Sequence, residues 1–343
     1  MIVTTSTRTR VALIGAGRMG SFHAESLTRR VPEADLAVIA DPADGAAEHL
    51  ADAVGCPRWV TDPMEAITDP DIDAVVVVAP ARLHSGLVVA AAAAGKAVFC
   101  EKPMALTLRE ADQAILAARN AGVVLQVGFN RRFAADFRAA HDIVADGGIG
   151  TPQLLRSVTR DPGLANPGGV PPWTIYRETL IHDFDALLWF NPGARPVEVF
   201  AAADALVAPD HKASGLLDTS VVIIRFDNGA IATAEASFSA AYGYDVRGEV
   251  FGSAGMVTAG SQTQTAMRHY TAAGMRQDTV RGDAALFRDA YTSELASFIA
   301  AVRSGSSPEV TGDDARAALT VALAAIESVK SNRPVRISEV DPA

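Results

Sequence analysis

The sequence is poor in cysteine, in basic residues relative to acidic ones, and in long hydrophobic runs. Cys56 and Cys100 are the only cysteines in 343 residues, which excludes a disulfide-based fold, and we read both as free thiols in a reducing cytosol. No stretch reaches the roughly 18 uninterrupted apolar residues of a membrane-spanning helix, and residues 1–10 contain no apolar core of signal-peptide length. We therefore expect a cytoplasmic protein with no membrane partner.

The charge balance excludes another class of partner. Asp and Glu outnumber Lys and Arg by 40 to 30, so the formal net charge is -10 and nucleic acid is not an expected partner. Neither cysteine has other metal-ligating residues at the spacing of a metal site, so we expect no metal. An apolar fraction of 49% and a length of 343 residues are typical of a globular protein of about two domains.

Strands and helices alternate through the first third of the chain. The stretch 74–80 shows no polar alternation, as expected for a strand that is covered on both faces. The repeated strand–helix order predicts an α/β, doubly wound parallel sheet in an N-terminal domain over residues 1–130. The predicted strands are 11–16, 35–41, 74–80, 96–101 and 123–129, and the predicted helices are 18–30, 45–55, 83–95 and 108–122.

The pattern changes in the second part, residues 131–343, where longer strands follow one another. The strands 219–226 and 230–240 are joined through Asp227, Asn228 and Gly229, a strong hairpin signal, and 246–260 is typical of a second hairpin. We therefore predict an α+β domain with a mostly antiparallel sheet. Its helices are predicted over 131–147, 178–190, 286–305 and 313–331.

Residues 15–20 read G-A-G-R-M-G, a glycine pattern that follows a predicted strand and begins a predicted helix. In this context Gly15 makes the tight turn, Gly17 lets the main chain approach a diphosphate, and Gly20 lets the helix pack on the strand. The helix N-terminus, with Arg18 and Met19, supplies free amides to the phosphates. The motif predicts a dinucleotide site, against the alternative of a plain strand–helix turn.

Asp41 ends the second strand, where an acid accepts hydrogen bonds from the hydroxyls of the adenosine ribose. A 2′-phosphate there would meet its negative charge, and no Arg or Lys follows within the next ten residues. NAD is therefore favoured over NADP. The alternative is that Asp41 merely begins a turn.

Other polar residues follow later strands at the same predicted edge. Ligands collect at the carboxyl ends of parallel strands, and these ends carry Ala79-Pro80, Glu101-Lys102 and Asn130-Arg131. We expect Lys102 beside the nicotinamide, where it can hydrogen-bond a substrate oxygen.

The predicted helix 178–190 carries a second group of polar residues. Glu178, His182 and Asp185 share one arc of an α-helix, apart from its apolar face. A histidine flanked by two acids is a plausible proton-transfer group. The alternative is an ordinary solvated helix face.

These motifs together carry a resemblance. GAGRMG, His84, AAGKAVFCEKPMALT, GFNRRF, TLIHDFD and AYGYDVRGEVFGSAGM occur in the order and spacing of the Gfo/Idh/MocA oxidoreductases, and the sequence looks closest to their inositol 2-dehydrogenases. The resemblance implies an N-terminal Rossmann domain, a C-terminal domain with a large open sheet, and a homotetramer. It also implies NAD-linked oxidation of a hydroxyl of a cyclic polyol or sugar, an inositol for example, to the ketone.

Within this resemblance, Lys102 and His182 are catalytic and Glu178 orients His182, although the inositol dehydrogenases usually carry aspartate at the position of Glu178. A Pro- and Gly-rich loop over 162–178 also departs from the family pattern. The expected cofactor-binding residues are Gly15, Gly17, Arg18, Met19, Asp41, Ala79, Pro80, His84, Glu101, Lys102 and Arg131. The expected substrate-binding residues are Lys102, Asn130, Arg131, Arg160, Trp173, Glu178, His182, Asp185 and Tyr244.

Two other functions are compatible with these motifs. Some relatives hold NAD tightly and oxidise a sugar transiently to cleave a glycosidic bond, and a sugar sensor would bind without turnover. Net NADH production with a free cyclitol would argue against the first, and the presence of both Lys102 and His182 argues against the second.

Overall fold

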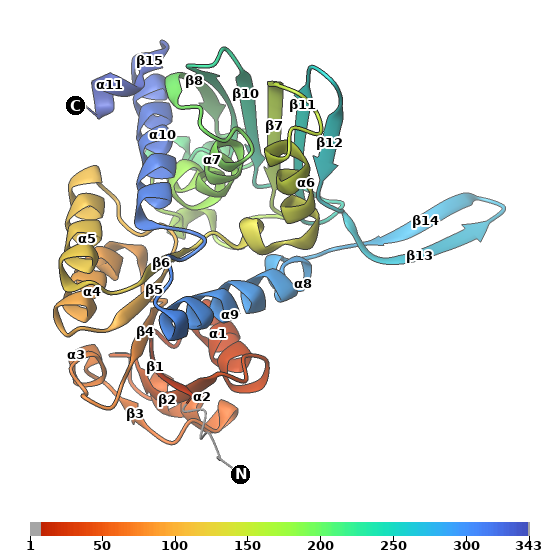
Figure 1. The fold of residues 1–343 in the computed structure, drawn as a ribbon. Helices are drawn as coiled ribbons and strands as arrows, with labels where there is room; N and C mark the ends of the chain where they lie inside the picture. Colours follow the sequence, from red (N-terminus) through yellow and green to blue (C-terminus); the bar gives the residue numbers. More distant parts are fainter. Residues whose placement is uncertain (1–7, 342–343) are drawn as a thin grey trace. The chain divides into compact units, whose positions relative to one another are not determined.

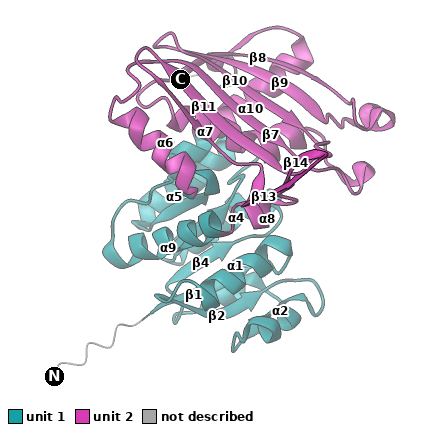
Figure 2. Cartoon of the chain, turned by 90° about the vertical axis from the view of Figure 1, so that its right-hand side faces the viewer, with its two compact units in different colours: residues 1–133, 289–316 teal, residues 134–288, 317–343 magenta. Residues whose placement is uncertain are grey.

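The computed structural model describes residues 8–341, so the expectation that residues 1–10 hold no signal peptide falls largely outside the described part of the chain. No helix among residues 8–341 is long and apolar enough to cross a membrane. The chain forms two compact units (Figure 2), residues 1–133 with 289–316, and residues 134–288 with 317–343. The sequence analysis placed a single domain boundary, between residues 130 and 131.

The first unit contains a six-stranded, wholly parallel sheet, which confirms the predicted doubly wound fold (Figure 1). Its order, β3-β2-β1-β4-β5-β6, places the reversal of winding between β1 and β4. The strands are β1 (Thr9–Ile14), β2 (Ala34–Ala40), β3 (Trp59–Val60), β4 (Ala74–Val77), β5 (Ala97–Glu101) and β6 (Leu125–Gly128).

Local signals fix the helices that connect these strands. The Thr107 side chain accepts a hydrogen bond from the Glu110 amide and Glu110 reaches back to the Thr107 amide, a capping box that begins α5. Gly122 ends the same helix in the left-handed conformation. The connecting helices are α1 (Arg18–Arg29), α2 (Ala46–Val54), α3 (Pro63–Ile67), α4 (Ala81–Ala93) and α5 (Leu108–Ala121).

Helix α9 (Arg288–Ser304) completes the core of the first unit although it lies late in the chain. Its Leu295, Phe298 and Ile299 are buried in the same cluster as Phe99 of β5 and residues of β1, β2 and α1. The ring of Phe298 lies 5.9 Å from that of Phe99. Apolar burial therefore assigns α9 to the parallel sheet, where it brings the side chains of its buried face close to β5.

The second unit contains a seven-stranded sheet in the order β12-β11-β7-β10-β9-β8-β15. Every pair is antiparallel except β7 with β10, which confirms a mostly antiparallel sheet and both predicted hairpins. The strands are β7 (Pro152–Arg160), β8 (Pro196–Asp204), β9 (Thr219–Phe226), β10 (Ile231–Ser237), β11 (Asp245–Gly252), β12 (Met256–Ala259) and β15 (Val335–Arg336).

Helices cover one face of this sheet. Three contacts hold these helices to the sheet. Asp183 of α7 accepts a hydrogen bond from Ser157 of β7, and Ser328 of α10 accepts one from the Ala201 amide of β8. Phe137 of α6 lies close to Gly248 of β11. The opposite face is exposed, as the alternating burial along β9 shows. The helices of this unit are α6 (Ala135–Ala145), α7 (Leu180–Trp189), α8 (Asp283–Leu286), α10 (Gly312–Ser331) and α11 (Ile337–Val340), with short 3₁₀ turns at Pro167–Gly169 and Pro209–Ser214. A third 3₁₀ turn, Asn130–Phe133, belongs to the first unit.

A hairpin that the sequence did not predict extends away from the rest of the second unit (Figure 1). Its strands are β13 (Thr263–Thr271) and β14 (Gly274–Thr279), which form a two-stranded sheet of their own within residues 8–341. Almost every side chain on it is exposed.

Candidate active site

The glycine-rich turn borders a cavity of about 890 Å³ within the first unit. This volume falls in the usual range for small-molecule sites. Seven of the predicted cofactor residues line it: Gly15, Gly17, Arg18, Met19, Asp41, Ala79 and Pro80. Pro42, Met64, Arg82 and Leu83 also line it and were missed, although Arg82 and Leu83 lie in the first turn of α4, which follows Pro80.

The three glycines of the motif meet different surroundings. A Cβ atom on Gly15, whose φ is +111°, would lie 2.7 Å from the Val78 carbonyl oxygen, and one on Gly20 would lie 2.0 Å from the Gly15 carbonyl oxygen. A Cβ on Gly17 would meet nothing within 4 Å, and Gly17 precedes α1 without a side-chain cap. Open space in front of the N-terminus of a helix fits the diphosphate of a dinucleotide.

Asp41 lies at the wall of this cavity directly after β2. Its Oδ2 accepts from the Ala16 amide at 2.7 Å and its Oδ1 accepts from the Ala43 amide at 2.8 Å. These bonds hold the carboxylate at the position that a ribose hydroxyl would approach in a dinucleotide fold.

Glu101 and Lys102, at the end of β5, have opposite environments. Lys102 is half-buried, whereas Glu101 is 6% exposed and lies 2.7 Å through Oε1 from Nε2 of His23. Burial raises the pKa of Glu101, but the hydrogen bond from His23 and the nearby charges of His23, Lys102 and His84 together outweigh burial and hold that pKa below its usual value. Glu101 Oε2 also accepts from the Lys102 amide at 3.1 Å. The acid therefore fixes the main chain that carries the lysine.

His84 ties two strand ends together. Its Nδ1 lies 2.8 Å from the Pro103 carbonyl oxygen and its Nε2 lies 2.6 Å from the Ala79 carbonyl oxygen. The side chain is buried, and both of its ring nitrogens are engaged by main-chain oxygens of the protein. Neither His84 nor Glu101, Lys102 or Arg131 lines the glycine-rich cavity.

Asn130 and Arg131 begin the 3₁₀ turn after β6 and are each 2% exposed. They follow a strand end of the same parallel sheet as Lys102. Their burial gives them fixed positions, which suits residues that hold a polar ligand or a neighbouring loop.

The predicted helix 178–190 begins with a π-helical turn, Ile175–Thr179, before α7. Exposed Glu178 lies in that turn, which contains about one more residue than an α-helical turn. Its placement relative to His182 therefore does not follow from the α-helical spacing used in the prediction. Half-buried His182 and buried Asp185 stay three residues apart on α7 and share one side of it.

Asp183, which the sequence reasoning missed, holds α7 to the sheet. It is fully buried, and its two oxygens accept from Ser157 Oγ at 2.5 Å and Thr159 Oγ1 at 2.7 Å. Ser157 and Thr159 are two residues apart and face the same side of β7. The position of His182 along the sheet thus depends on the residue beside it. The available signal in the sequence was the placing of hydroxyl side chains at alternate positions of the strand, Ser157 and Thr159, which puts both on one face.

The loop before α7 contains a strained tryptophan. Trp173 has a φ of +67°, which is unfavourable for a residue with a Cβ atom, and the Lys330 amine lies 5.3 Å from its ring centroid. The Tyr176 hydroxyl lies 2.8 Å from Ser220 Oγ, and burial raises the pKa of Tyr176 to about 12. These contacts hold the segment that leads into Glu178.

The two remaining substrate candidates, Arg160 and Tyr244, also belong to the second unit. Arg160 donates to Glu235 at 3.1 Å and, because Thr159 faces α7, it lies on the opposite side of β7. The ring of half-buried Tyr244 lies edge-on to that of Phe287, with the centroids 6.5 Å apart.

Models of known protein families match both parts of the chain. Residues 9–129 match the oxidoreductase family model with an NAD-binding Rossmann fold, and residues 137–258 match the GFO/IDH/MocA C-terminal domain. The chain belongs to the Gfo/Idh/MocA family. It is therefore an NAD-dependent oxidoreductase, as the resemblance in the sequence implied.

The similar proteins of this family include inositol dehydrogenases. Myo-inositol 2-dehydrogenase of Thermotoga maritima is 38% identical over 96% of this chain and 99% of its own length, and scyllo-inositol 2-dehydrogenase (NAD(+)) of Bacillus subtilis is 35% identical over 96% of each. Scyllo-inositol dehydrogenase of Lactobacillus casei, solved with NAD(H) and scyllo-inositol, is 26% identical with a TM-score of 0.92 over 96% of this chain and 99% of that chain.

Proposed function

We propose that this Gfo/Idh/MocA protein oxidises a secondary hydroxyl of an inositol to the ketone. Full-length similarity to inositol dehydrogenases at 35% to 38% identity is the observation that carries the proposal. The cavity beside Gly17 and the placement of Asp41 support NAD as the hydride acceptor.

The cofactor would be held by residues of the first unit. The N-terminal amides of α1 would bind its diphosphate and Asp41 its adenosine ribose. When bound, NAD supplies an acceptor for the hydride that leaves the alcohol carbon. The side chains of the protein then handle the hydroxyl proton and the orientation of the substrate.

Lys102 and His182 are assigned to the reacting hydroxyl. Lys102 donates a hydrogen bond to its oxygen, which stabilises negative charge as the proton leaves. His182 accepts that proton at a ring nitrogen, and Glu178 favours the resulting imidazolium by its negative charge. Oxidation needs both effects, since a hydride leaves readily only from an alcohol that loses its proton.

Further polar side chains are assigned to the neighbouring hydroxyls. Asn130, Arg131 and Asp185 are buried and so have restricted rotamers, and Tyr244 and Trp173 are partly exposed. An inositol offers a hydroxyl on every ring carbon, and donors and acceptors fixed in advance discriminate between its stereoisomers.

The test is a panel of inositols and aldoses with NAD and with NADP, followed by NADH absorbance. The account predicts turnover with myo-inositol or scyllo-inositol and NAD, and no turnover in His182→Asn. His49→Asn, at an exposed histidine on α2, is the matched control. Turnover of aldoses alone would contradict the assigned substrate.

We also propose that the protein forms a homotetramer. Ile231, Leu154, Phe251 and Met256 are direct neighbours in register across β10, β7, β11 and β12. Each is more than 40% exposed, so they form an apolar row on the uncovered face of the sheet. Such a row is typical of a surface that a second copy covers.

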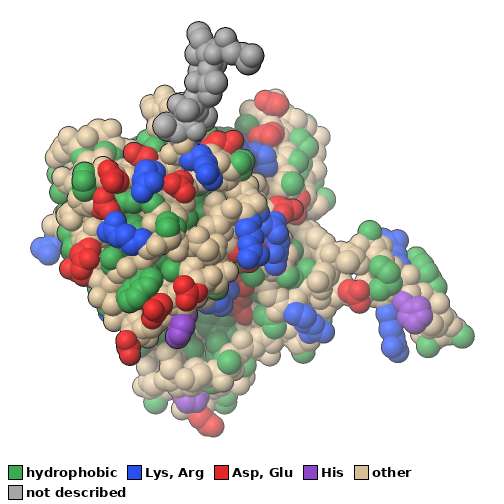
Figure 3. All heavy atoms as spheres, turned by 90° about the horizontal axis from the view of Figure 1, so that it is seen from below, with side chains coloured by type: hydrophobic (Ala, Val, Ile, Leu, Met, Phe, Trp, Pro, Cys, Tyr) green, Lys and Arg blue, Asp and Glu red, His purple; other side chains and the backbone are tan. Residues whose placement is uncertain are grey.

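The hairpin β13–β14 supplies a second surface for this assembly. Its paired Tyr270 and Met275 are 70% and 52% exposed, and cationic and apolar side chains gather on the projecting hairpin (Figure 3). An isolated two-stranded hairpin is marginally stable in water. Two different surfaces suit a tetramer built from pairs of dimers. Light scattering should show a tetramer that Leu154→Glu divides; a monomeric wild type would contradict the proposal.

A further inference from the structure

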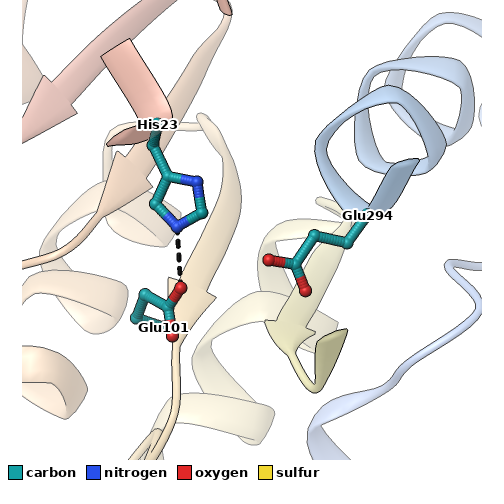
Figure 4. Close-up of side chains that lie close together, drawn as sticks. All are labelled: His23, Glu101 and Glu294. Carbon is teal, nitrogen blue, oxygen red and sulfur yellow. Dashed lines mark hydrogen bonds and ion pairs between the residues drawn. The ribbon is translucent and has the colours of Figure 1, made fainter. Parts of the chain in front are cut away.

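Three buried polar side chains of the first unit come together beside the Glu101–Lys102 turn (Figure 4). His23 comes from α1, Glu101 ends β5, and Glu294 lies on α9 with its carboxyl group directed toward the other two. One nitrogen or oxygen atom of each lies within 4.8 Å of the others. His23 and Glu294 are 0% exposed.

Hydrogen bonds join only part of this cluster. His23 bonds to Oε1 of Glu101, and Oε2 of Glu101 accepts from the Lys102 amide. Both carboxyl oxygens of Glu294, and Nδ1 of His23, are buried without a hydrogen-bond partner among residues 8–341. An ionised carboxylate is very unfavourable in that position, so Glu294 either carries a proton or binds a cation.

We propose that Glu294 is a neutral carboxylic acid which, with His23, positions Glu101 and through it the main chain at Lys102. The inference rests on the role given to Lys102 in the proposed function. As an acid, Glu294 has one O–H group to donate, and the carboxylate of Glu101 is the acceptor beside it. A small side-chain movement completes this bond, since the groups lie within 4.8 Å.

Distances favour a proton over a metal ion in this cluster. His23 Nε2 and Glu101 Oε1 are 2.7 Å apart, which is a hydrogen-bond distance. Two ligands of a tetrahedral zinc ion, each about 2.0 Å from the metal, lie about 3.3 Å apart. A metal ion would therefore have to separate a pair that the structure holds together.

The surrounding charges place the proton on Glu294 and leave Glu101 ionised. Burial, and then the negative charge of Glu101, raise the pKa of Glu294 well above its usual value. The pKa of Glu101 is lowered, because His23, Lys102 and His84 lie near it and outweigh the effect of its burial. The titratable groups that face the cluster are His23 of α1, His84 of α4, Glu101 and Lys102 of β5 and its turn, and Tyr291 of α9.

Aromatic rings surround the cluster and keep its geometry fixed. The ring of His23 lies 5.7 Å from that of Phe99 and 5.9 Å from that of Tyr291. Helix α9 is held at this point by Gln126, whose Nε2 donates to the Glu294 carbonyl oxygen at 2.7 Å. The acid of Glu294 thus reaches the cluster from a helix with a fixed position.

A set of variants tests the positioning role. Glu294→Ala should lower kcat about ten- to a hundredfold through displacement of Lys102, with KM for NAD unchanged. Glu294→Gln, which resembles the neutral acid, should restore most of that loss. Asp289→Asn, at an exposed acid on the same helix, is the matched control. A Gln variant as impaired as the Ala variant, or one equivalent of metal in the purified wild type by mass spectrometry, would overturn the proposal.

A second measurement tests the protonation state without activity. An unfolded glutamate ionises near pH 4.3, so a folded acid with a raised pKa makes the wild type less stable as pH rises above that value. Glu294→Gln does not titrate, so its melting temperature should rise relative to wild type between pH 5 and pH 8. A constant difference would overturn the neutral acid. The difference in melting temperature could rise with pH while Lys102→Ala remains fully active. That pair of results would overturn both the positioning role of Glu294 and the proposed role of Lys102, and only the conclusion that Glu294 is a neutral acid would stand.

Discussion

The two proposed catalytic residues are held in place in different ways. Lys102 follows β5 directly, and its main chain is fixed by Glu101, whose carboxylate accepts from the Lys102 amide. His182 lies on a helix whose neighbouring residue, Asp183, is bonded to two hydroxyl groups of β7. A strand end fixes the lysine, whereas the histidine depends on particular side chains. Substitutions around the histidine should therefore affect folding and activity together, and those at the lysine should separate them.

After the complete loss expected for His182→Asn, the largest effect is expected for Lys102→Ala. Loss of one acid–base group should lower kcat by about 10² to 10⁴-fold. Binding of NAD, measured by fluorescence titration, should change little, because Lys102 does not line the glycine-rich cavity. A near-normal kcat would show that this lysine only ends a strand.

A smaller loss of activity, with a clear loss of stability, is expected for Asp183→Ala. The change leaves Ser157 and Thr159 without their buried acceptor, and hydrogen bonds to a charged group contribute about 1.5–3 kcal/mol each. The melting temperature and kcat should both fall, and both should fall less in Asp183→Asn than in Asp183→Ala. Full activity in a destabilised Ala variant would show that the bonds from β7 do not position His182.

Glu178→Gln should lower kcat about tenfold, because a nearby negative charge that favours the imidazolium is removed. Glu178→Asp keeps the charge and shortens the side chain, so it tests geometry alone in the same assay. If both variants turn over at the wild-type rate, the exposed acid is only a helix-turn charge.

The mildest effect is expected at the cofactor. Asp41→Ala should lower kcat/KM with NAD and raise kcat/KM with NADP several-fold, because the ribose hydrogen bonds and the repulsion of a 2′-phosphate are lost together. Arg82, which lines the same cavity, then offers a cation to that phosphate. Comparison of kcat/KM with the two cofactors is the measurement. A wild type that already prefers NADP would reverse the assignment of Asp41.

The sequence predicted the first unit best, because its signals are local. The spacing of Gly15, Gly17 and Gly20 has meaning within one strand–turn–helix unit, and the structure places all three in the expected turn. The doubly wound topology is then the one that right-handed connections favour. The capping box of Thr107 is equally local.

Other features depend on long-range packing and did not show in the pattern. The periodicity of residues 286–305 identifies an apolar helix face but not the sheet that it meets, so the return of α9 to the first unit and the burial of Glu294 were not predicted. The π-turn at Glu178 arises in a segment whose Trp173 is also strained. The hairpin β13–β14 has mixed polar residues and no two-residue turn signal.

The most direct test of the account is the fate of the hydrogen on the reacting carbon. Inositol that is deuterated on every ring carbon should be oxidised more slowly than the protonated compound, with deuterium recovered in the reduced cofactor and a ketone as the second product. Release of the deuterium to water, or binding of inositol with no reduced cofactor formed, would contradict the central claim that this chain transfers a hydride from a cyclitol to NAD.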